Sequence, residues 1–347
     1  MNATRNLMLC VSIAVLSIGD GIAQEAFSTT GKIERLDPAL NALIPADAKI
    51  EVLAEGFEWS EGPVWIKEAD GSGFVVFSDV PTNKVHRWKE GEGLSVYLEP
   101  SGFTAGGTRP GELGSNGLTT DAKGSLLLCQ HGDRRIARMT SPTSAQKPQY
   151  ETVVDNYDGK KFNSPNDLAI ARDGTIYFTD PIYGLVKREE DPSREIDFCG
   201  VYRVKPGGKA ELVDDGLPRP NGIALSPDEK TLYVAQSHGA APIYQAYALG
   251  DDGSIGEGKI VFNAKHLTAD RRGMPDGIKV DTAGNIWGTG PGGVLIISPE
   301  GKHLGSILTG QRTANCAFGG PDGKILYMTC DGFLMRLRTN AKGATVK

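Results

Sequence analysis

Three short stretches decide the fold of this chain: residues 164–168 (SPNDL), 219–223 (RPNGI) and 274–278 (MPDGI). Each has an Asn or Asp directly after a proline and directly before an apolar segment. The central residues Asn166, Asn221 and Asp276 are evenly spaced (221 − 166 = 55 and 276 − 221 = 55). Self-similarity at a fixed period of this size indicates a repeat architecture, in which one closed array can use the whole chain.

The repeated unit has an apolar strand, a tight turn containing Asp or Gly, and a second apolar strand. Copies of the starting position lie at Glu61, Asn116, Asn166, Asn221, Asp276 and Asn315. Repeats of roughly 40–55 residues have the size of propeller blades. The segments between turns are rich in Val, Ile, Leu, Tyr and Phe and show no sustained helical period, which favours strands. The sequence therefore predicts an all-β fold, a six-bladed β-propeller.

The last copy is one strand short, which predicts how the ring closes. It holds only the strands 316–318, 325–329 and 333–338. The outermost strands of the other copies are expected at 95–98, 150–154, 210–213, 259–262 and 304–308. We expect residues 49–53 to complete the last blade, because mixing the two chain ends removes open sheet edges. The propeller domain is then 49–340, preceded by a lead-in of residues 24–48.

The N-terminus has the pattern of an export signal. Arg5 supplies positive charge, and an apolar run at 7–18 is too short to span a bilayer. Residues 21–23 (GIA) are small at the positions that a signal peptidase reads. We expect residues 1–23 to be a signal peptide cleaved after Ala23, and the mature protein to be periplasmic or secreted. An N-terminal membrane anchor is the alternative, but no stop-transfer pattern follows.

Composition narrows the classes of partner. The net charge is −6 and the Lys and Arg residues are scattered, which argues against nucleic-acid and anionic-membrane partners. The four cysteines after the signal segment fit no zinc motif, so buried thiols are expected; they are Cys129, Cys199, Cys316 and Cys330. Export would permit a disulfide, but the sequence assigns none.

The starting positions of the six copies predict a metal site. The innermost strand of each blade begins next to the axis of a propeller, so all six side chains can point into one funnel. Two carboxylates and several amide oxygens suit a hard divalent cation. Calcium is the best match, with magnesium, manganese and zinc as alternatives. A single Asn-Gly or Asp-Gly is an ordinary turn former, but the same register in every copy favours a metal.

The ends of the second strands predict the rest of the pocket. These strands return to the same face, one layer further from the axis. Their ends are polar or rich in glycine: 130–132 (QHG), 180–184 (DPIYG), 237–239 (SHG) and 290–293 (GPGG). We expect them to surround the metal, although loop polarity alone also explains such residues.

These motifs resemble the SMP-30/gluconolactonase family of six-bladed propeller lactonases over about residues 51–338. The most specific stretches are 61–65 (EGPVW), 131–135 (HGDRR), 163–167 (NSPND), 178–185 (FTDPIYGL), 219–222 (RPNG) and 275–277 (PDG). The resemblance implies that the metal ligands are Glu61, Asn166, Asn221 and Asp276. It also implies that Asp276 is the general base or a metal-linked catalytic carboxylate, and that Asp167 supports the ligands from behind.

The resemblance implies a metal-dependent hydrolase that opens the ester bond of a sugar lactone. Asn116, His131 and Tyr183 are our candidates for binding the sugar hydroxyls. Two alternatives remain open. One is a metal-dependent phosphotriesterase or arylesterase, because related propellers share the four-ligand pattern. The other is a non-catalytic binding propeller, because fold alone does not fix function.

Overall fold

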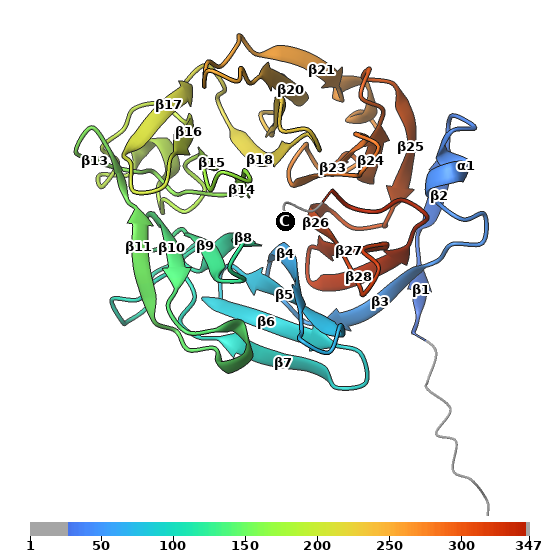
Figure 1. The fold of residues 1–347 in the computed structure, drawn as a ribbon, viewed down its shortest axis with the longest axis horizontal. Coiled ribbons are helices and arrows are strands. Elements are labelled where there is room, and N and C mark those ends of the chain that lie inside the picture. The colour runs from blue at the N-terminus through green and yellow to red at the C-terminus, as the bar shows by residue number, and fades with distance from the viewer. Residues whose placement is uncertain (1–26, 345–347) are drawn as a thin grey trace, which may run out of the picture.

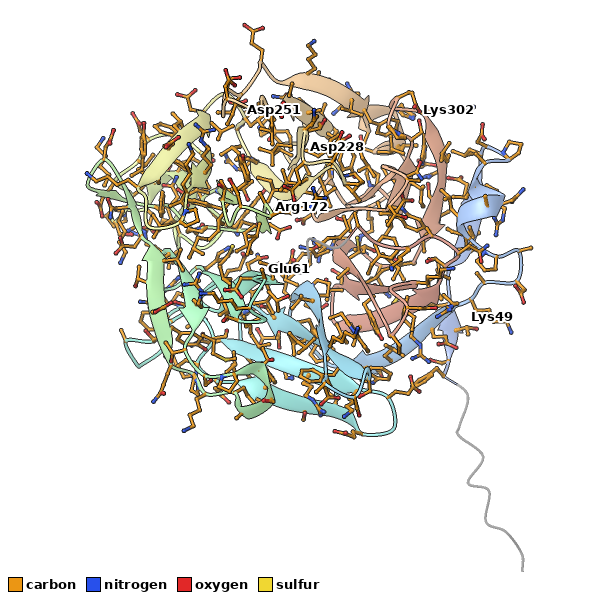
Figure 2. The ribbon with its side chains drawn as sticks, viewed as in Figure 1. Lys49, Glu61, Arg172, Asp228, Asp251 and Lys302 are labelled. Atoms are coloured by element: carbon orange, nitrogen blue, oxygen red, sulfur yellow. The ribbon has the colours of Figure 1, made fainter. Side chains whose placement is uncertain are left out.

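Antiparallel sheets surround a central axis in the computed structural model, which describes residues 27–344 (Figure 1). Six sheets of four or five strands form the blades, so the predicted six-bladed β-propeller is confirmed. Each blade runs outward from the axis, and its innermost strand begins on the same face of the ring. Glu61 lies near the axis, whereas Lys49 and Lys302 lie at the periphery (Figure 2). The proposed signal peptide lies outside the described residues.

The first four blades each use one continuous stretch of chain. Blade 1 consists of β4 (Ser60–Lys67), β5 (Gly73–Asp79), β6 (Lys84–Lys89) and β7 (Gly93–Leu98). Blade 2 consists of β8 (Ser115–Thr120), β9 (Leu126–Gln130), β10 (Arg135–Met139) and β11 (Tyr150–Val154). Blade 3 consists of β14 (Leu168–Ile170), β15 (Ile176–Asp180), β16 (Gly200–Val204) and β17 (Ala210–Asp214). Blade 4 consists of β18 (Pro220–Leu225), β19 (Thr231–Gln236), β20 (Ile243–Ala248) and β21 (Lys259–Asn263).

The last two blades also use N-terminal strands. Blade 5 consists of β22 (Ile278–Val280), β23 (Ile286–Gly290), β24 (Gly293–Ile297), β25 (His303–Leu308) and, at its edge, β2 (Lys32–Arg35). Blade 6 consists of β26 (Thr313–Gly319), β27 (Ile325–Cys330), β28 (Phe333–Arg338), β3 (Ile50–Glu55) and β1 (Thr29–Thr30). The pairing of β3 with β28 joins the two ends of the chain. This is the place expected for residues 49–53.

Short elements connect the blades. They are α1 (Leu40–Leu43), the hairpin of β12 (Asn156–Tyr157) with β13 (Lys160–Lys161), and the 3-10 helices η1 (Thr143–Ala145), η2 (Arg188–Glu190) and η3 (Lys265–Leu267). None of the helices within residues 27–344 is long and apolar enough to cross a membrane.

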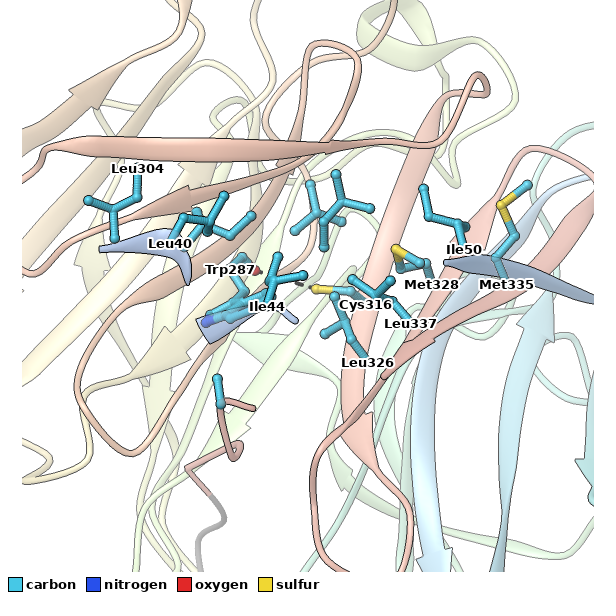
Figure 3. Close-up of a cluster of buried hydrophobic side chains, with 14 of the residues drawn as sticks. Leu40, Ile44, Ile50, Trp287, Leu304, Cys316, Leu326, Met328, Met335 and Leu337 are labelled. Atoms are coloured by element: carbon cyan, nitrogen blue, oxygen red, sulfur yellow. Dashed lines mark hydrogen bonds between the residues drawn. The ribbon is translucent and has the colours of Figure 1, made fainter. Parts of the chain in front are cut away.

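The lead-in has a structural role that the sequence did not indicate: it connects blade 5 to blade 6. Strand β2 pairs with β25, and Glu34 binds the guanidinium of Arg271 through both carboxylate oxygens at 2.9 and 3.0 Å. Leu40 of helix α1 and Ile44, the residue after the helix, insert into a buried cluster that also contains Trp287 and side chains of blade 6 (Figure 3). These contacts are remote in sequence, so no local pattern predicts them.

The cores lie between neighbouring blades, where apolar faces of adjacent sheets pack together. The four cysteines named above are all buried free thiols, as expected. The described part of the chain therefore gains its stability from packing between blades and from closure of the ring, without a disulfide.

Candidate metal centre and active site

A cavity of about 470 Å³ opens at the face where the innermost strands begin. We call it the hub cavity. Five of the six predicted starting positions line it: Glu61, Asn116, Asn166, Asn221 and Asp276. Its other lining residues are Trp59, Glu112, Tyr183, Arg188, Ser237, Gly273, Met274, Arg312, Thr313 and Ala314. The proposed metal ligands are thus brought together from four different blades or the loops before them.

Bulges in the innermost strands aim these side chains at the axis. In blade 2 the register shifts between Ser115 and Leu118, and in blade 4 between Pro220 and Ile223. A bulge places an extra residue against one partner and re-aims its side chain. Asn116 and Asn221 sit inside these bulges and therefore face the cavity.

Glycines after the starting positions let neighbouring blades approach closely. A Cβ on Gly222 would lie 2.0 Å from the carbonyl oxygen of Asp276. A Cβ on Gly62 would lie 2.2 Å from the carbonyl oxygen of Asn116. The glycine of one blade is therefore required because the hub residue of the next blade packs against it.

Asn315 departs from the prediction that all six starting positions face the funnel. In blade 6 the bulge falls between Thr313 and Asn315, so Ala314 occupies the position of Asn116 and Asn221. Ala314 lines the cavity and Asn315 does not. A shift of one residue moves a strand side chain to the other side. The sequence alignment of this copy was therefore wrong by one residue.

Asp167 and Asn315 lie together below the cavity. Asn315 Nδ2 donates to Asp167 Oδ2 at 3.4 Å, and Asn315 Oδ1 accepts the backbone N–H of Cys316 at 2.9 Å. Lys279 Nζ lies 4.0 Å from Asp167 Oδ2. Asp167 is 2% exposed and does not line the cavity.

Buried oxygen atoms without partners mark the hub. Asn116 Oδ1, Asn221 Oδ1 and Asp276 Oδ1 are buried and accept no hydrogen bond. Buried acceptors are almost always satisfied, so three orphans around one cavity call for a ligand that accepts their lone pairs. Within residues 27–344 no group of three or more His, Cys, Asp or Glu side chains could hold a metal ion. A cation here would therefore depend on the amide oxygens.

Burial and mutual repulsion raise the pKa values of the carboxyl groups at the hub. Burial, with added repulsion from Asp167 and Glu112, raises the pKa of Glu61 to about 8. Burial also raises the pKa of Asp276 well above its ordinary range, and the charge of Glu61 adds to this effect. Both carboxyl groups would be stabilised in their charged form by a bound cation.

Side chains at the ends of the second strands hold the loops that carry the hub residues. Asp79 Oδ1 accepts the backbone N–H groups of Glu58 and Trp59 at 3.1 and 3.0 Å. Asp180 does the same for Asn163 and Ser164, at 2.8 and 2.7 Å. Asp79 and Asp180 thus fix the approach to Glu61 and Asn166 from behind. Of the stretches that follow these second strands, 180–184 and 237–239 also contribute Tyr183 and Ser237 to the cavity wall.

The three candidates for sugar binding divide into two groups. Asn116 and Tyr183 line the hub cavity. Burial raises the pKa of Tyr183 to about 12, so its hydroxyl keeps its proton at neutral pH. His131 is 0% exposed and does not line the cavity; its Nδ1 lies 3.4 Å from Glu112 Oε2. His131 therefore lies behind Glu112, and neither of its ring nitrogens has a hydrogen-bond partner among the described residues.

Sequence reasoning missed several lining residues because they lie outside the repeat register. Glu112 belongs to the loop between β7 and β8, and Arg188 to the loop between β15 and β16. Trp59 and Arg312 face the cavity as a stacked pair, with the guanidinium carbon 4.9 Å from the ring centre. Only the position of Trp59, two residues before Glu61, offered a signal.

Known proteins with similar sequences and structures agree with this architecture. A gluconolactonase of Zymomonas mobilis is 40% identical over 324 residues, which cover 91% of this chain and 88% of that protein. A regucalcin of Xenopus laevis is 27% identical over 296 residues, covering 82% and 88%. The solved structure of a gluconolactonase from Xanthomonas campestris has a TM-score of 0.75 and 31% identity, covering 91% and 99%.

The family profile described as SMP-30/Gluconolactonase/LRE-like region matches residues 59–331. This range begins at Trp59, beside the hub, and ends at Asp331 after β27. It contains every residue that lines the hub cavity. The chain belongs to the SMP-30/gluconolactonase family.

Proposed function

We propose that this chain is a lactonase that hydrolyses the ester bond of a sugar lactone with the help of a divalent cation in the hub cavity. The observation that carries the proposal is the set of three buried side-chain oxygens without hydrogen-bond partners, on Asn116, Asn221 and Asp276. The 40% identity to a gluconolactonase over 91% of the chain supports the choice of substrate.

The donor set fits a hard cation. Glu61, Asn166, Asn221 and Asp276 would hold it, with two carboxylates and two amides as oxygen donors. Calcium suits such ligands best, and magnesium, manganese and zinc are the alternatives. When bound, the cation would supply Lewis acidity that polarises a carbonyl and stabilises negative charge on its oxygen. With only two anionic ligands, a divalent charge would not be over-compensated.

Residues of this chain supply the remaining steps. Asp276 Oδ1 has no hydrogen-bond partner and is our candidate to take a proton from the attacking water. Tyr183 keeps its hydroxyl proton and can donate a hydrogen bond to the lactone. Asn116 lines the same cavity and offers a free carbonyl oxygen to a sugar hydroxyl.

The test is a pH-stat screen of cation-loaded protein against sugar lactones, simple acyl lactones, aryl esters and phosphotriesters. We expect the highest kcat/KM on a five- or six-membered sugar lactone. Better turnover of aryl esters or phosphotriesters would favour the phosphotriesterase or arylesterase alternative. Binding of the cation without hydrolysis of any ester would favour a binding propeller.

The role of Asn116 has its own test. Asn116→Ala should lower kcat/KM for a sugar lactone. The loss of transition-state stabilisation should be about 1–3 kcal/mol, which is the cost of leaving a buried polar group without a partner. The loss should be much smaller for a simple lactone without hydroxyls. Equal losses on both would show that Asn116 supports the cation instead.

A further inference from the structure

Two loops bring a carboxylate and a guanidinium group together at the wall of the hub cavity. Glu112 comes from the loop before β8, and Arg188 from the loop after β15. Glu112 Oε1 lies 3.4 Å from Arg188 Nη2. Charge-assisted pairs are usually about 2.7–2.9 Å apart. The pair is therefore loose enough for other polar groups to share its hydrogen-bonding capacity.

Arg188 has a donor nitrogen that no residue within 27–344 uses. Its Nη1 is buried and makes no hydrogen bond. The guanidinium carbon lies 5.2 Å from the centre of the Tyr183 ring, another residue of the cavity wall. The backbone of Arg188 is left-handed, with φ at 54°, a conformation that non-glycine residues rarely adopt. Such backbone conformations persist where the surrounding structure or a function requires them.

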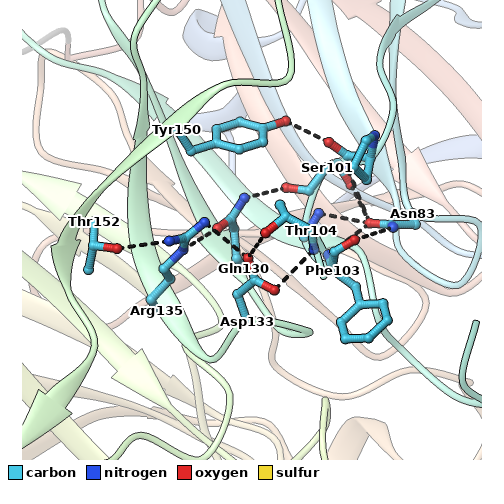
Figure 4. Close-up of polar contacts among 11 residues, drawn as sticks. Asn83, Ser101, Phe103, Thr104, Gln130, Asp133, Arg135, Tyr150 and Thr152 are labelled. Carbon is cyan, nitrogen blue, oxygen red and sulfur yellow. Dashed lines mark hydrogen bonds and ion pairs between the residues drawn. The ribbon is translucent and has the colours of Figure 1, made fainter. Parts of the chain in front are cut away.

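A buried histidine lies behind Glu112, and polar contacts fix the first residues of the loop that carries Glu112. His131 is fully buried, and its Nδ1 lies 3.4 Å from Glu112 Oε2. The start of the loop is fixed by Asn83, whose Oδ1 accepts backbone N–H groups from Gly102 and Phe103 at 2.8 and 3.0 Å (Figure 4). Asp133 binds the backbone N–H and the hydroxyl of Thr104 in the same network.

An acceptor beside a donor matches two neighbouring hydroxyl groups. A carboxylate only accepts hydrogen bonds and a guanidinium only donates them, whereas each hydroxyl does both. One hydroxyl can therefore donate to Glu112 while its neighbour accepts from Arg188. A ligand carboxylate fits poorly, because it could bind Arg188 only beside the negative charge of Glu112.

We propose that Glu112 and Arg188 form the subsite that selects neutral lactones with adjacent hydroxyls over lactones that carry a carboxylate. This inference rests on the proposed lactonase function and extends it to residues outside the repeat. The Tyr183 ring packs against the Arg188 guanidinium, and His131 lies behind Glu112.

The experiment compares Glu112→Gln and Arg188→Lys with a control, Glu189→Gln. Glu189 neighbours Arg188 and pairs with Arg219, but neither Glu189 nor Arg219 lines the hub cavity. The substrates are glucono-δ-lactone, δ-valerolactone without hydroxyls, and a glucarolactone with a carboxylate. Both test variants should lose about tenfold or more in kcat/KM on gluconolactone, mainly through KM, and about twofold or less on valerolactone. Glu112→Gln should also gain on the glucarolactone, which a merely structural role of Glu112 would not produce.

A binding measurement separates this inference from the proposed function. Anhydroglucitol has the ring hydroxyls but no lactone carbonyl, and its binding is measured by calorimetry. If the wild type binds it and both variants bind more weakly, without hydrolysis of any lactone, the subsite stands and the lactonase proposal fails. If the wild type hydrolyses gluconolactone and both variants behave as Glu189→Gln does, or if the wild type prefers the glucarolactone, the subsite is overturned.

Discussion

Ser237 Oγ accepts a hydrogen bond of 2.8 Å from Asn221 Nδ2 and donates one of 2.6 Å to the backbone carbonyl of Pro275. This pair fixes the amide of Asn221 so that its Oδ1 stays free. The same hydroxyl ties Asn221 to the residue before Asp276. One serine thus links two of the proposed ligands from neighbouring blades.

Ser237→Ala should weaken cation binding without unfolding the protein. Partners that orient metal ligands typically contribute about 10–100-fold to affinity. Calcium titration by calorimetry should show a loss in that range. Ser226→Ala is the matched control, because the Ser226 hydroxyl bonds to Asp228 in a turn outside the hub cavity. Unchanged calcium affinity in Ser237→Ala would contradict the orienting role.

Asp276→Asn should remove lactone hydrolysis, because an amide cannot take a proton from water. We expect kcat to fall by about 100-fold or more, the usual contribution of a general base. Chelation should abolish activity, and calcium should restore it. Asp270→Asn, at an exposed side chain nearby, should leave kcat unchanged. Full activity after chelation, or in Asp276→Asn, would refute these roles.

The cation-free protein should lose stability as the pH rises. Glu61 has a folded-state pKa of about 8 against an ordinary 4.5, because of burial and neighbouring negative charge. The folded state then binds more protons than the unfolded state, so this stabilising contribution is complete below 4.5 and lost as the pH rises through about 8. A bound cation needs the charged carboxylate and should reverse the trend.

Thermal unfolding at about pH 5 and about pH 8 measures this effect. Burial lowers the pKa of His86 and His303, and these residues act in the opposite direction. The informative quantity is therefore the difference between wild type and Glu61→Gln. We expect the pH-dependent loss of Tm without cation to be larger in the wild type. A smaller loss than in the variant would contradict the assignment.

Gly222→Ala should damage both stability and cation binding. The new Cβ would lie 2.0 Å from the carbonyl oxygen of Asp276, so the two blades must move apart. Overpacking of this kind typically costs about 1–3 kcal/mol. Gly239→Ala is the control, since its Cβ would find its nearest neighbour at 3.9 Å. Chemical denaturation and calcium titration together distinguish global loss from local displacement.

Export is tested by mass spectrometry of the protein from its native host. Arg5, the apolar run at 7–18 and the small residues at 21–23 lead us to propose a mature chain that begins near Gln24. An intact Met1 in the cytosolic fraction would overturn that proposal.

The parts of the fold that depend on local chemistry could be predicted from the sequence. The turns with Asp and Gly mark the hairpins, and the expected outermost strands agree with β7, β11, β17, β21 and β25 within two residues. The strand at 49–53 could be assigned because the last copy lacked one. Strand β2 could not, since blade 5 already has four strands without it and no copy lacked a partner for it.

The site was less predictable than the ring. Asn315 has the same residue type as Asn116, but the bulge in blade 6 falls one residue earlier relative to it. Bulge positions depend on strand pairing, which composition does not reveal. Glu112 lies in an irregular loop and Arg188 begins the one-turn helix η2, and neither belongs to a repeat that assigns a direction to its side chain. The place of His131 behind Glu112 depends on packing, which its position at the end of a strand does not reveal.

The pairing of β3 with β28 also constrains the order in which the parts of the protein can fold. Glu51 in β3 binds Arg336 in β28 across 285 positions of sequence, so one of the first strands to be synthesised must wait for one of the last. Contacts of such long sequence separation form late and slowly. Blades 1 to 5 can form their own hairpins earlier, but the spacing of the hub oxygens is fixed only when the ring closes. Cation binding would then require that the ring has closed. During refolding, calcium uptake should therefore lag behind the formation of β-structure.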